Sequence, residues 1–247
     1  MKTENTNIIG KLDIADAQIR KMFEAGAHYA YSRAKRHPST AEFLFGAKNG
    51  IDIFDLEKTT ASLEEVKKFI QELFATGPKQ ILFVGSKSEI KDIVKTAAEI
   101  ADMPFVTNRW VGGTLTNFEN IKKRTEKFQK LTEDKEAGNL LKYTKKERGK
   151  LDEEIEKLRR RFSGIVSMKT LPAAMFVVDP RYEMVAVAEA RQKNIPIIAI
   201  ANSDCNVKEI QFPILANDTS PRSVKFFVEE IATACKTKTT KIQEDKL

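Results

Sequence analysis

One segment of the chain brings together a cation, an aromatic ring, two glycines and a run of amide and hydroxyl side chains. It is residues 108–117, in which Arg109 directly precedes Trp110, the single tryptophan of the chain. An arginine can pair with a phosphate, an indole can stack on a base, and amide or hydroxyl groups can bond to a nucleic-acid backbone. The pattern therefore indicates RNA binding. The alternative is a tight turn with Trp110 in the core, and both descriptions can hold together.

Two further groups of basic residues are weaker indications of the same chemistry. Residues 29–37 mix tyrosines with arginines and a lysine, and residues 159–161 are three consecutive arginines. Taken alone, the first group is equally well explained as a polar loop and the second as a helix surface, because charged residues usually line solvated faces. The net charge of +7 comes mostly from residues 117–163. Such an asymmetry is typical of a protein with a polyanionic partner.

Catalytic and metal-binding chemistry finds less support in the sequence. The histidines, His28 and His37, and the cysteines, Cys205 and Cys235, show no metal-ligand spacing, and no nucleophile has an evident general base. Two cysteines also make no disulfide framework and fit a reducing compartment. We therefore expect no catalytic residue, no metal and no cofactor.

The competing hypothesis is an enzyme on an α/β scaffold that binds a nucleotide or a sugar phosphate. Residues 85–88 lie where a predicted strand meets a helix, and residues 202–204 follow a later strand. Backbone amides at such positions can bind phosphate. Neither segment matches a phosphate-binding loop signature, so turn-forming and helix-capping roles explain these residues better.

The elements that would position these residues alternate along the chain. Short apolar runs at residues 81–84, 174–178 and 197–201 are separated by segments with helically spaced apolar residues. Fully apolar strands between amphipathic helices are typical of parallel βαβ units with helices on both faces of the sheet. We therefore predict an α/β fold built on a doubly wound parallel sheet.

Both ends of the chain carry additional signals. The spacing predicts a helix from about Asp13 that stops at Gly26, and then a β-hairpin whose tight turn is formed by Asn49 and Gly50. A last helix is predicted to begin at Ser220, and the residues from Lys236 onward are expected to form a polar disordered tail.

A charged segment, residues 117–163, interrupts the α/β pattern. Its apolar residues recur every three or four positions in two stretches, with a turn at residues 137–139 and a capping box at residues 144–147. A narrow apolar stripe on each helix indicates an inserted antiparallel coiled-coil hairpin. The predicted organisation is a discontinuous α/β RNA-binding domain at residues 1–116 and 164–235, the hairpin at 117–163 and the tail at 236–247.

Length and hydropathy predict a soluble globular protein. The chain has 247 residues, of which 41% are hydrophobic and 31% charged, and this is enough apolar material for a core. The apolar runs are much shorter than the roughly 18 residues of a membrane span, and the polar N-terminal stretch does not look like a secretory signal. We expect a cytoplasmic protein without a membrane partner.

Several blocks of the chain match a known pattern. They are residues 45–46, 49–51, 55–56, 81–85, 108–118, 171–172, 176–180, 186–191 and 195–196. Through them the chain closely resembles the bacterial small-ribosomal-subunit protein number two family, collinearly from about Met22 to Ile231. Residues 109–117 are highly specific to the family, whereas a βαβ sheet alone hosts many functions.

The resemblance implies a flavodoxin-like sheet with a projecting coiled-coil hairpin, and a structural, non-catalytic role near the head–body junction of the small subunit. It also implies contacts with small-subunit ribosomal RNA and with neighbouring ribosomal proteins. In many bacteria the family anchors the large messenger-binding ribosomal protein number one. That docking stays open here, because the chain departs from the family at residues 28–31, 173 and 201–207.

Ten residues are selected as RNA-binding candidates from these patterns. The six cations among them are expected to contact phosphates, and three polar side chains to bond to the RNA backbone or to the loop itself. Trp110 either stacks on a base or locks the base of the hairpin, and the second role is favoured. The candidates are Arg33, Lys35, Arg36, Lys87, Asn108, Arg109, Trp110, Thr114, Asn117 and Arg222.

Overall fold

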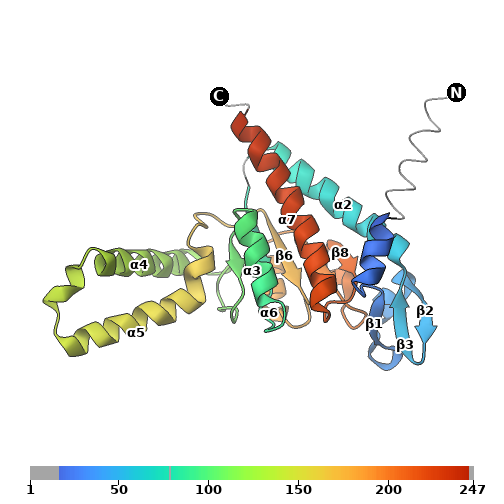
Figure 1. The fold of residues 1–247 in the computed structure, drawn as a ribbon, viewed down its shortest axis with the longest axis horizontal. Coiled ribbons are helices and arrows are strands. Elements are labelled where there is room, and N and C mark those ends of the chain that lie inside the picture. Colours follow the sequence, from blue (N-terminus) through green and yellow to red (C-terminus); the bar gives the residue numbers. More distant parts are fainter. Residues whose placement is uncertain (1–16, 78, 245–247) are drawn as a thin grey trace.

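The computed structural model describes residues 17–77 and 79–244, and its centre is a parallel sheet of five strands (Figure 1). The strands are β4 (Ile81–Val84), β5 (Phe105–Val106), β6 (Ala174–Val178), β7 (Ile197–Ala201) and β8 (Phe212–Leu215). Their spatial order is β5-β4-β6-β7-β8, all parallel. This strand order is consistent with a flavodoxin-like sheet, and the predicted α/β fold on a parallel sheet is confirmed.

Helices cover both faces of this sheet, which explains why its strands are apolar without alternation. On one face α2 (Leu56–Ala75), α3 (Lys91–Ile100) and α7 (Pro221–Glu244) pack against residues such as Phe83 and Phe176. On the other face α6 (Met184–Gln192) packs against Leu82, Val84 and Val177, the neighbours that point the opposite way. The buried side chains on the two faces of the sheet form two clusters, which together make up the core.

A second sheet of three antiparallel strands precedes the parallel one. It contains β1 (Tyr29–Ser32), β2 (Leu44–Lys48) and β3 (Ile51–Phe54) in the order β1-β3-β2. The predicted hairpin is confirmed, since Asn49 and Gly50 both adopt positive φ (51° and 77°) between β2 and β3. Strand β1 was not predicted, because it pairs with β3 across an irregular register that leaves no alternating pattern.

Both ends of the described chain are helical. Residues 17–24 form a helix, Met22 is fully buried, and Gly26 follows with φ 75°, as expected of a helix stop. Residues 13–16, where that helix was predicted to begin, lie outside the described residues. At the other end α7 runs to Glu244, past Lys236, where the sequence predicted a disordered tail. Extending a docked helix costs much less than nucleating one, which accounts for the difference.

Two long helices lie side by side and project away from the sheet (Figure 1). They are α4 (Phe118–Glu136) and α5 (Lys145–Phe162), and they lie where the spacing of apolar residues predicted helices. A short 3₁₀ helix, η3 (Asn139–Lys142), joins them, and the predicted capping box of Thr144 and Glu147 begins α5. Their inner faces bury a narrow set of side chains, and salt bridges join Lys127 to Glu154 and Lys135 to Asp152.

Among the described residues, no helix has the length and the apolar content that crossing a bilayer requires.

Candidate nucleic-acid interface

The loop between β5 and α4 is tied to one buried carboxylate, that of Glu189 on α6. This side chain is only 7% exposed and accepts five hydrogen bonds from the loop. The donors are the Trp110 indole Nε1 (3.0 Å), the backbone N–H groups of Gly113 (2.8 Å), Leu115 (3.0 Å) and Thr116 (3.1 Å), and the Thr116 hydroxyl (3.1 Å). One carboxylate thus fixes the path of the chain from Trp110 to Thr116.

The electrostatics of Glu189 fit this anchoring role. Burial by itself would raise the pKa of its carboxyl group, but the hydrogen bonds from Trp110 and from three backbone N–H groups outweigh that effect. The net result is a pKa below the usual value. Glu189 is therefore charged at neutral pH, and its charge is balanced by donors that the loop supplies.

The structure distinguishes between the two roles considered for Trp110. The indole is 9% exposed and belongs to the core cluster on the α6 face of the sheet. This burial and the hydrogen bond to Glu189 favour the role in which the indole locks the loop beneath the hairpin. Thr114 is likewise buried, and its hydroxyl donates to the carbonyl of Val111 at 2.6 Å. It stabilises the loop from within.

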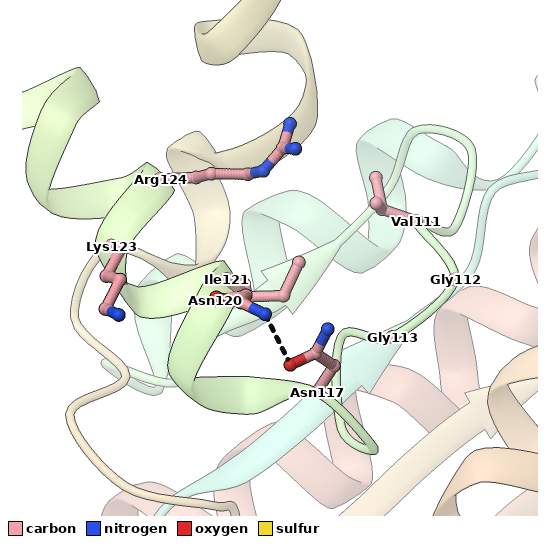
Figure 2. A pocket seen from close by; sticks show the side chains of 8 residues that line it. All are labelled: Val111, Gly112, Gly113, Asn117, Asn120, Ile121, Lys123 and Arg124. Carbon is pink, nitrogen blue, oxygen red and sulfur yellow. Dashed lines mark hydrogen bonds between the residues drawn. The ribbon is translucent and has the colours of Figure 1, made fainter.

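Two asparagine candidates join the loop to the projecting helices. The Asn108 Nδ2 donates to the carbonyl of Arg160 at 2.8 Å and so connects the loop to the last turn of α5. The Asn117 Oδ1 accepts from the Asn120 Nδ2 at 2.9 Å in the first turn of α4 (Figure 2). Both asparagines are exposed, so they retain hydrogen-bonding capacity toward a ligand.

The end of the hairpin nearest the sheet, residues 107–124 and 158–163, is named the hairpin root. It carries six exposed cations, of which Arg159 pairs with Glu156, and the other five form no salt bridge within the part of the chain that the structure describes. They are Arg109 in the loop, Lys123 and Arg124 on α4, and Arg160 and Arg161 on α5. An uncompensated group of cations on a fixed frame is a suitable surface for phosphates.

Two hollows in the hairpin root bring these cations next to the loop. One, of about 580 Å³, is lined by Arg109, Arg160 and Arg161 together with Asn108 and the start of the loop. The other, of about 530 Å³, lies between the glycines of the loop and α4. Val111 forms part of the wall of the second hollow, and Figure 2 shows the Arg124 side chain extending from α4 toward it. Both hollows share Val111 and Gly112.

The candidates from residues 33–36 lie at a different place. They follow β1 beside a third hollow, of about 680 Å³, whose lining includes Lys35, Arg36 and the start of α6. The Arg36 guanidinium lies 3.8 Å from a carboxylate oxygen of Asp52, which is fully buried. The Lys35 ammonium lies 5.4 Å from the centre of the Tyr31 ring, and Arg33 is exposed.

The remaining two cations differ in availability. Arg222 is exposed in the first turn of α7. Lys87, by contrast, pairs with the carboxylates of Asp179 and Asp218. Burial would lower the pKa of Lys87, but these two carboxylates, Asp218 above all, raise it beyond the usual value. Lys87 is thus paired within the protein, and its role as a phosphate contact stays a prediction. No local pattern indicated this pairing, because both aspartates are distant along the chain.

The carboxyl edge of the sheet, where an enzyme would bind a phosphate, is occupied by internal contacts. The Glu183 carboxylate accepts from the backbone N–H of Ser86 at 2.8 Å and from its hydroxyl, and Asn202 donates to Asp218 at 2.7 Å. Burial, together with the charge of Asp179, raises the pKa of Asp218 to about 6. The carboxylates grouped around the paired Lys87 repel an anion, so residues 85–88 and 202–204 do not suit a nucleotide or a sugar phosphate.

The cysteines and histidines add no reactive centre to the described part of the chain. Burial raises the pKa of Cys205 and of Cys235 to about 12, so each thiol stays protonated at neutral pH. Across residues 17–77 and 79–244, no three His, Cys, Asp or Glu side chains gather closely enough to hold a metal ion.

Glu189, Lys123 and Arg124 were not predicted as parts of this site. The sequence did contain a signal for Glu189. It lies three positions after Ala186 and one before Ala190, so helical spacing places its carboxylate on the buried face of α6. A lone carboxylate on a buried face needs several donors. Nothing local distinguishes Lys123 and Arg124 from other cations of the hairpin, since only the fold brings them to the loop.

Comparison with known proteins identifies the family of the chain. The family model described as ribosomal protein S2 matches residues 22–238. The chain is also similar to the small ribosomal subunit protein uS2 of Chloroflexus aggregans (strain MD-66 / DSM 9485), with 40% identity over 216 residues, which cover 87% of this chain and 90% of that protein. The residues matched by the family model include the loop, Glu189 and the hairpin. The chain belongs to the ribosomal protein S2 family.

Proposed function

We propose that this protein is a structural constituent of the small ribosomal subunit, and that it supports translation by binding small-subunit ribosomal RNA and neighbouring ribosomal proteins near the head–body junction. Membership of the ribosomal protein S2 family supports the assignment to the subunit. The observation that carries the RNA-binding part is the group of five unpaired cations on the hairpin root. No catalytic step and no cofactor enter this proposal, and the protein acts in the cytoplasm as part of the ribosome.

The hairpin root binds RNA through side chains at its rim. The backbone N–H groups of Gly113, Leu115 and Thr116 would otherwise form a cradle for a phosphate, but Glu189 already occupies them. Phosphates are instead held by Arg109 and by the cations of α4 and α5. Because the loop is fixed by Glu189, its backbone loses little conformational freedom when RNA binds.

The projecting helices serve as a second contact surface. We propose that α4 and α5 form an antiparallel coiled coil, with Ile121, Phe128 and Ile155 in the narrow buried seam and a polar exterior. A helix of 19 residues is about 28 Å long at 1.5 Å per residue, so the hairpin reaches well beyond the sheet. It packs on neighbouring RNA or proteins of the subunit.

Sucrose-gradient fractionation of native lysate tests the proposal. The gradients contain millimolar magnesium at two salt concentrations, and the chain is followed by mass spectrometry. We expect stoichiometric co-migration with the small subunit that weakens as the salt concentration rises, because RNA binding releases counter-ions. Migration only at the top of the gradient at both salt concentrations would contradict the proposal. It would favour the alternative of an enzyme that binds a nucleotide or a sugar phosphate.

A further inference from the structure

A hollow of about 490 Å³ adjoins the hairpin root on the side of α6. Its lining comprises Ser86, Arg109, Trp110, Gly112, Tyr182, Glu183 and Val185. Arg109, Trp110 and Gly112 also line the larger hollow that contains Arg160 and Arg161. On its other side, the neighbouring residues Arg181 and Met184 line the hollow that contains Lys35 and Arg36. The hollows therefore follow one another along the carboxyl edge of the sheet.

The wall of this hollow contributed by the start of α6 is unusually apolar for an exposed surface. Tyr182 and Val185, which line this hollow, are 59% and 52% exposed, and Met184 between them is 68% exposed and lines the adjoining hollow of about 680 Å³. Three large apolar side chains exposed within four residues are typical of an interaction site rather than of a solvated helix. Arg109, the one cation in the lining of this hollow, is exposed and forms no salt bridge within the described residues, whereas the Glu183 side chain of the same lining is buried.

The Tyr182 ring is held in place while much of its surface stays open. The backbone N–H of Tyr182 donates to a carboxylate oxygen of Asp179 at 2.9 Å, which fixes the start of α6. The Lys87 ammonium lies over the ring, 5.9 Å from its centre. Lys87 is itself half-buried by its two aspartate partners, so it supports the inner face of the ring. The accessible remainder of the ring faces the hollow and solvent.

We propose that Tyr182 is a stacking platform for an unpaired base of single-stranded RNA, whose phosphates lie on Arg109 and the cations of the hairpin root. This inference rests on the proposed RNA-binding function and specifies the form of RNA at one place. An aromatic ring beside a cationic track is the combination by which proteins hold single strands. A duplex keeps its bases stacked inside, so only an unpaired base reaches the ring. The unpaired cations favour a polyanion as the partner here over a protein with an apolar surface.

Fluorescence anisotropy with the full-length chain tests this proposal. The probes are an unstructured labelled RNA of ten nucleotides and a labelled RNA duplex of about the same charge. Tyr182→Ala should weaken binding of the single strand by about tenfold, the order expected for the loss of one base–aromatic stack. Tyr182→Phe should retain the affinity, because the ring remains. Binding of the duplex should change less than twofold in either variant.

Phe45 provides a control of similar size. It is an aromatic side chain on β2 that is 82% exposed and lines none of the four hollows. Phe45→Ala should leave both affinities unchanged. Thermal unfolding of each variant verifies that the fold is intact, as expected for exposed side chains.

The remaining outcomes overturn the inference in distinguishable ways. Unchanged single-strand affinity in Tyr182→Ala, with normal RNA binding otherwise, contradicts the stack but not the proposed function. An equal loss for single strand and duplex shows that Tyr182 does not select unpaired bases. Unchanged RNA affinity together with reduced incorporation into small subunits identifies a protein neighbour at this surface instead. If the unaltered chain binds neither RNA, the proposed function fails as well.

Discussion

The indole Nε1 of Trp110 donates a hydrogen bond of 3.0 Å to Glu189, and the same carboxylate oxygen accepts the backbone N–H of Gly113 at 2.8 Å. The only tryptophan of the chain and a carboxylate 79 positions later therefore form one anchor beneath the projecting hairpin. The consequence is that the loop is held by protein rather than by ligand. In the proposed function, RNA therefore contacts the cations around the loop instead of the backbone N–H groups that Glu189 occupies.

Removal of the anchor should destabilise the whole domain. Glu189→Ala leaves without an acceptor the buried indole N–H, the buried backbone N–H of Leu115 and the part-buried backbone N–H groups of Gly113 and Thr116. We expect a loss of at least about 2 kcal/mol in the free energy of unfolding. Glu189→Gln should also destabilise, because its amide group would face the N–H donors of Leu115 and Thr116. Urea denaturation at neutral pH measures both changes.

A surface glutamate supplies the control for that experiment. Glu99 on α3 is 54% exposed and pairs only with Lys95 at 3.8 Å. Its replacement by alanine should change the free energy of unfolding by less than about 0.5 kcal/mol. A Glu189→Ala variant as stable as this control would show that the hydrogen bonds of the loop are not important for folding.

Asp218 should make the protein less stable as the pH rises. Burial raises the pKa of Asp218 in the folded protein from its ordinary value of 3.8 to about 6, so the folded protein binds more protons than the unfolded chain between those values. The stabilisation associated with the proton is complete below the lower pKa and is lost as the pH rises through the higher one. Asp218→Asn removes this titration. Between about pH 4 and 7.5, the free energy of unfolding should decline less in the variant than in the unaltered protein. An identical decline in the two would exclude Asp218 as the source of the pH dependence.

Gly164 determines how closely the hairpin returns to the sheet. A Cβ atom added there would overlap the carbonyl oxygen and the ring of Phe105. Gly164→Ala should therefore cost about 1–3 kcal/mol of stability, the usual range for overpacking. Gly149 lies inside α5 with open space around it, so Gly149→Ala should stabilise by about 0.5–1 kcal/mol. Thermal unfolding of the two variants measures both effects. Equal changes in stability would contradict the close approach of Gly164 to Phe105.

The hairpin should be the mobile part of the free protein. Its buried seam is narrow, and most of its polar surface has no partner among the described residues. Amide hydrogen exchange in the isolated protein should therefore be much faster across α4 and α5 than across β6 and β7, which are buried on both faces. Exchange that is equally slow in the hairpin and in the central strands would contradict this expectation.

Much of the fold follows from the sequence, because the signals are local. The apolar strands, the helices between them and the Asn49-Gly50 turn are set by residue type and spacing, and each was predicted. What could not be predicted depends on residues that meet only in the folded chain. β1 is defined by an irregular pairing with β3, and Lys87 is neutralised by two aspartates from later loops. The anchor joins Trp110 to Glu189 across two elements of secondary structure.

The candidate interface shows the same division. Arg109 and the asparagines of the loop could be selected from one short block, since their residue types suit RNA. The arginines of residues 159–161 were only a weak indication, and Lys123 and Arg124 gave none, because these cations resemble the others of a charged helix until the fold brings them to the loop. Trp110 was assigned to either of two roles from the sequence, and its burial favours the lock.

The salt dependence of RNA binding tests the central claim most directly. The affinity of the full-length chain for small-subunit ribosomal RNA is measured over a range of salt concentrations. Arg160→Ala/Arg161→Ala should lower the slope of log affinity against log salt by about 1 for each phosphate that the variant no longer binds, without changing the unfolding temperature. Lys67→Ala/Lys95→Ala, which removes two cations already paired with glutamates, should leave the slope unchanged. An unchanged slope in the arginine variant, or an equal decrease in the lysine control, would contradict the hairpin root as the RNA interface.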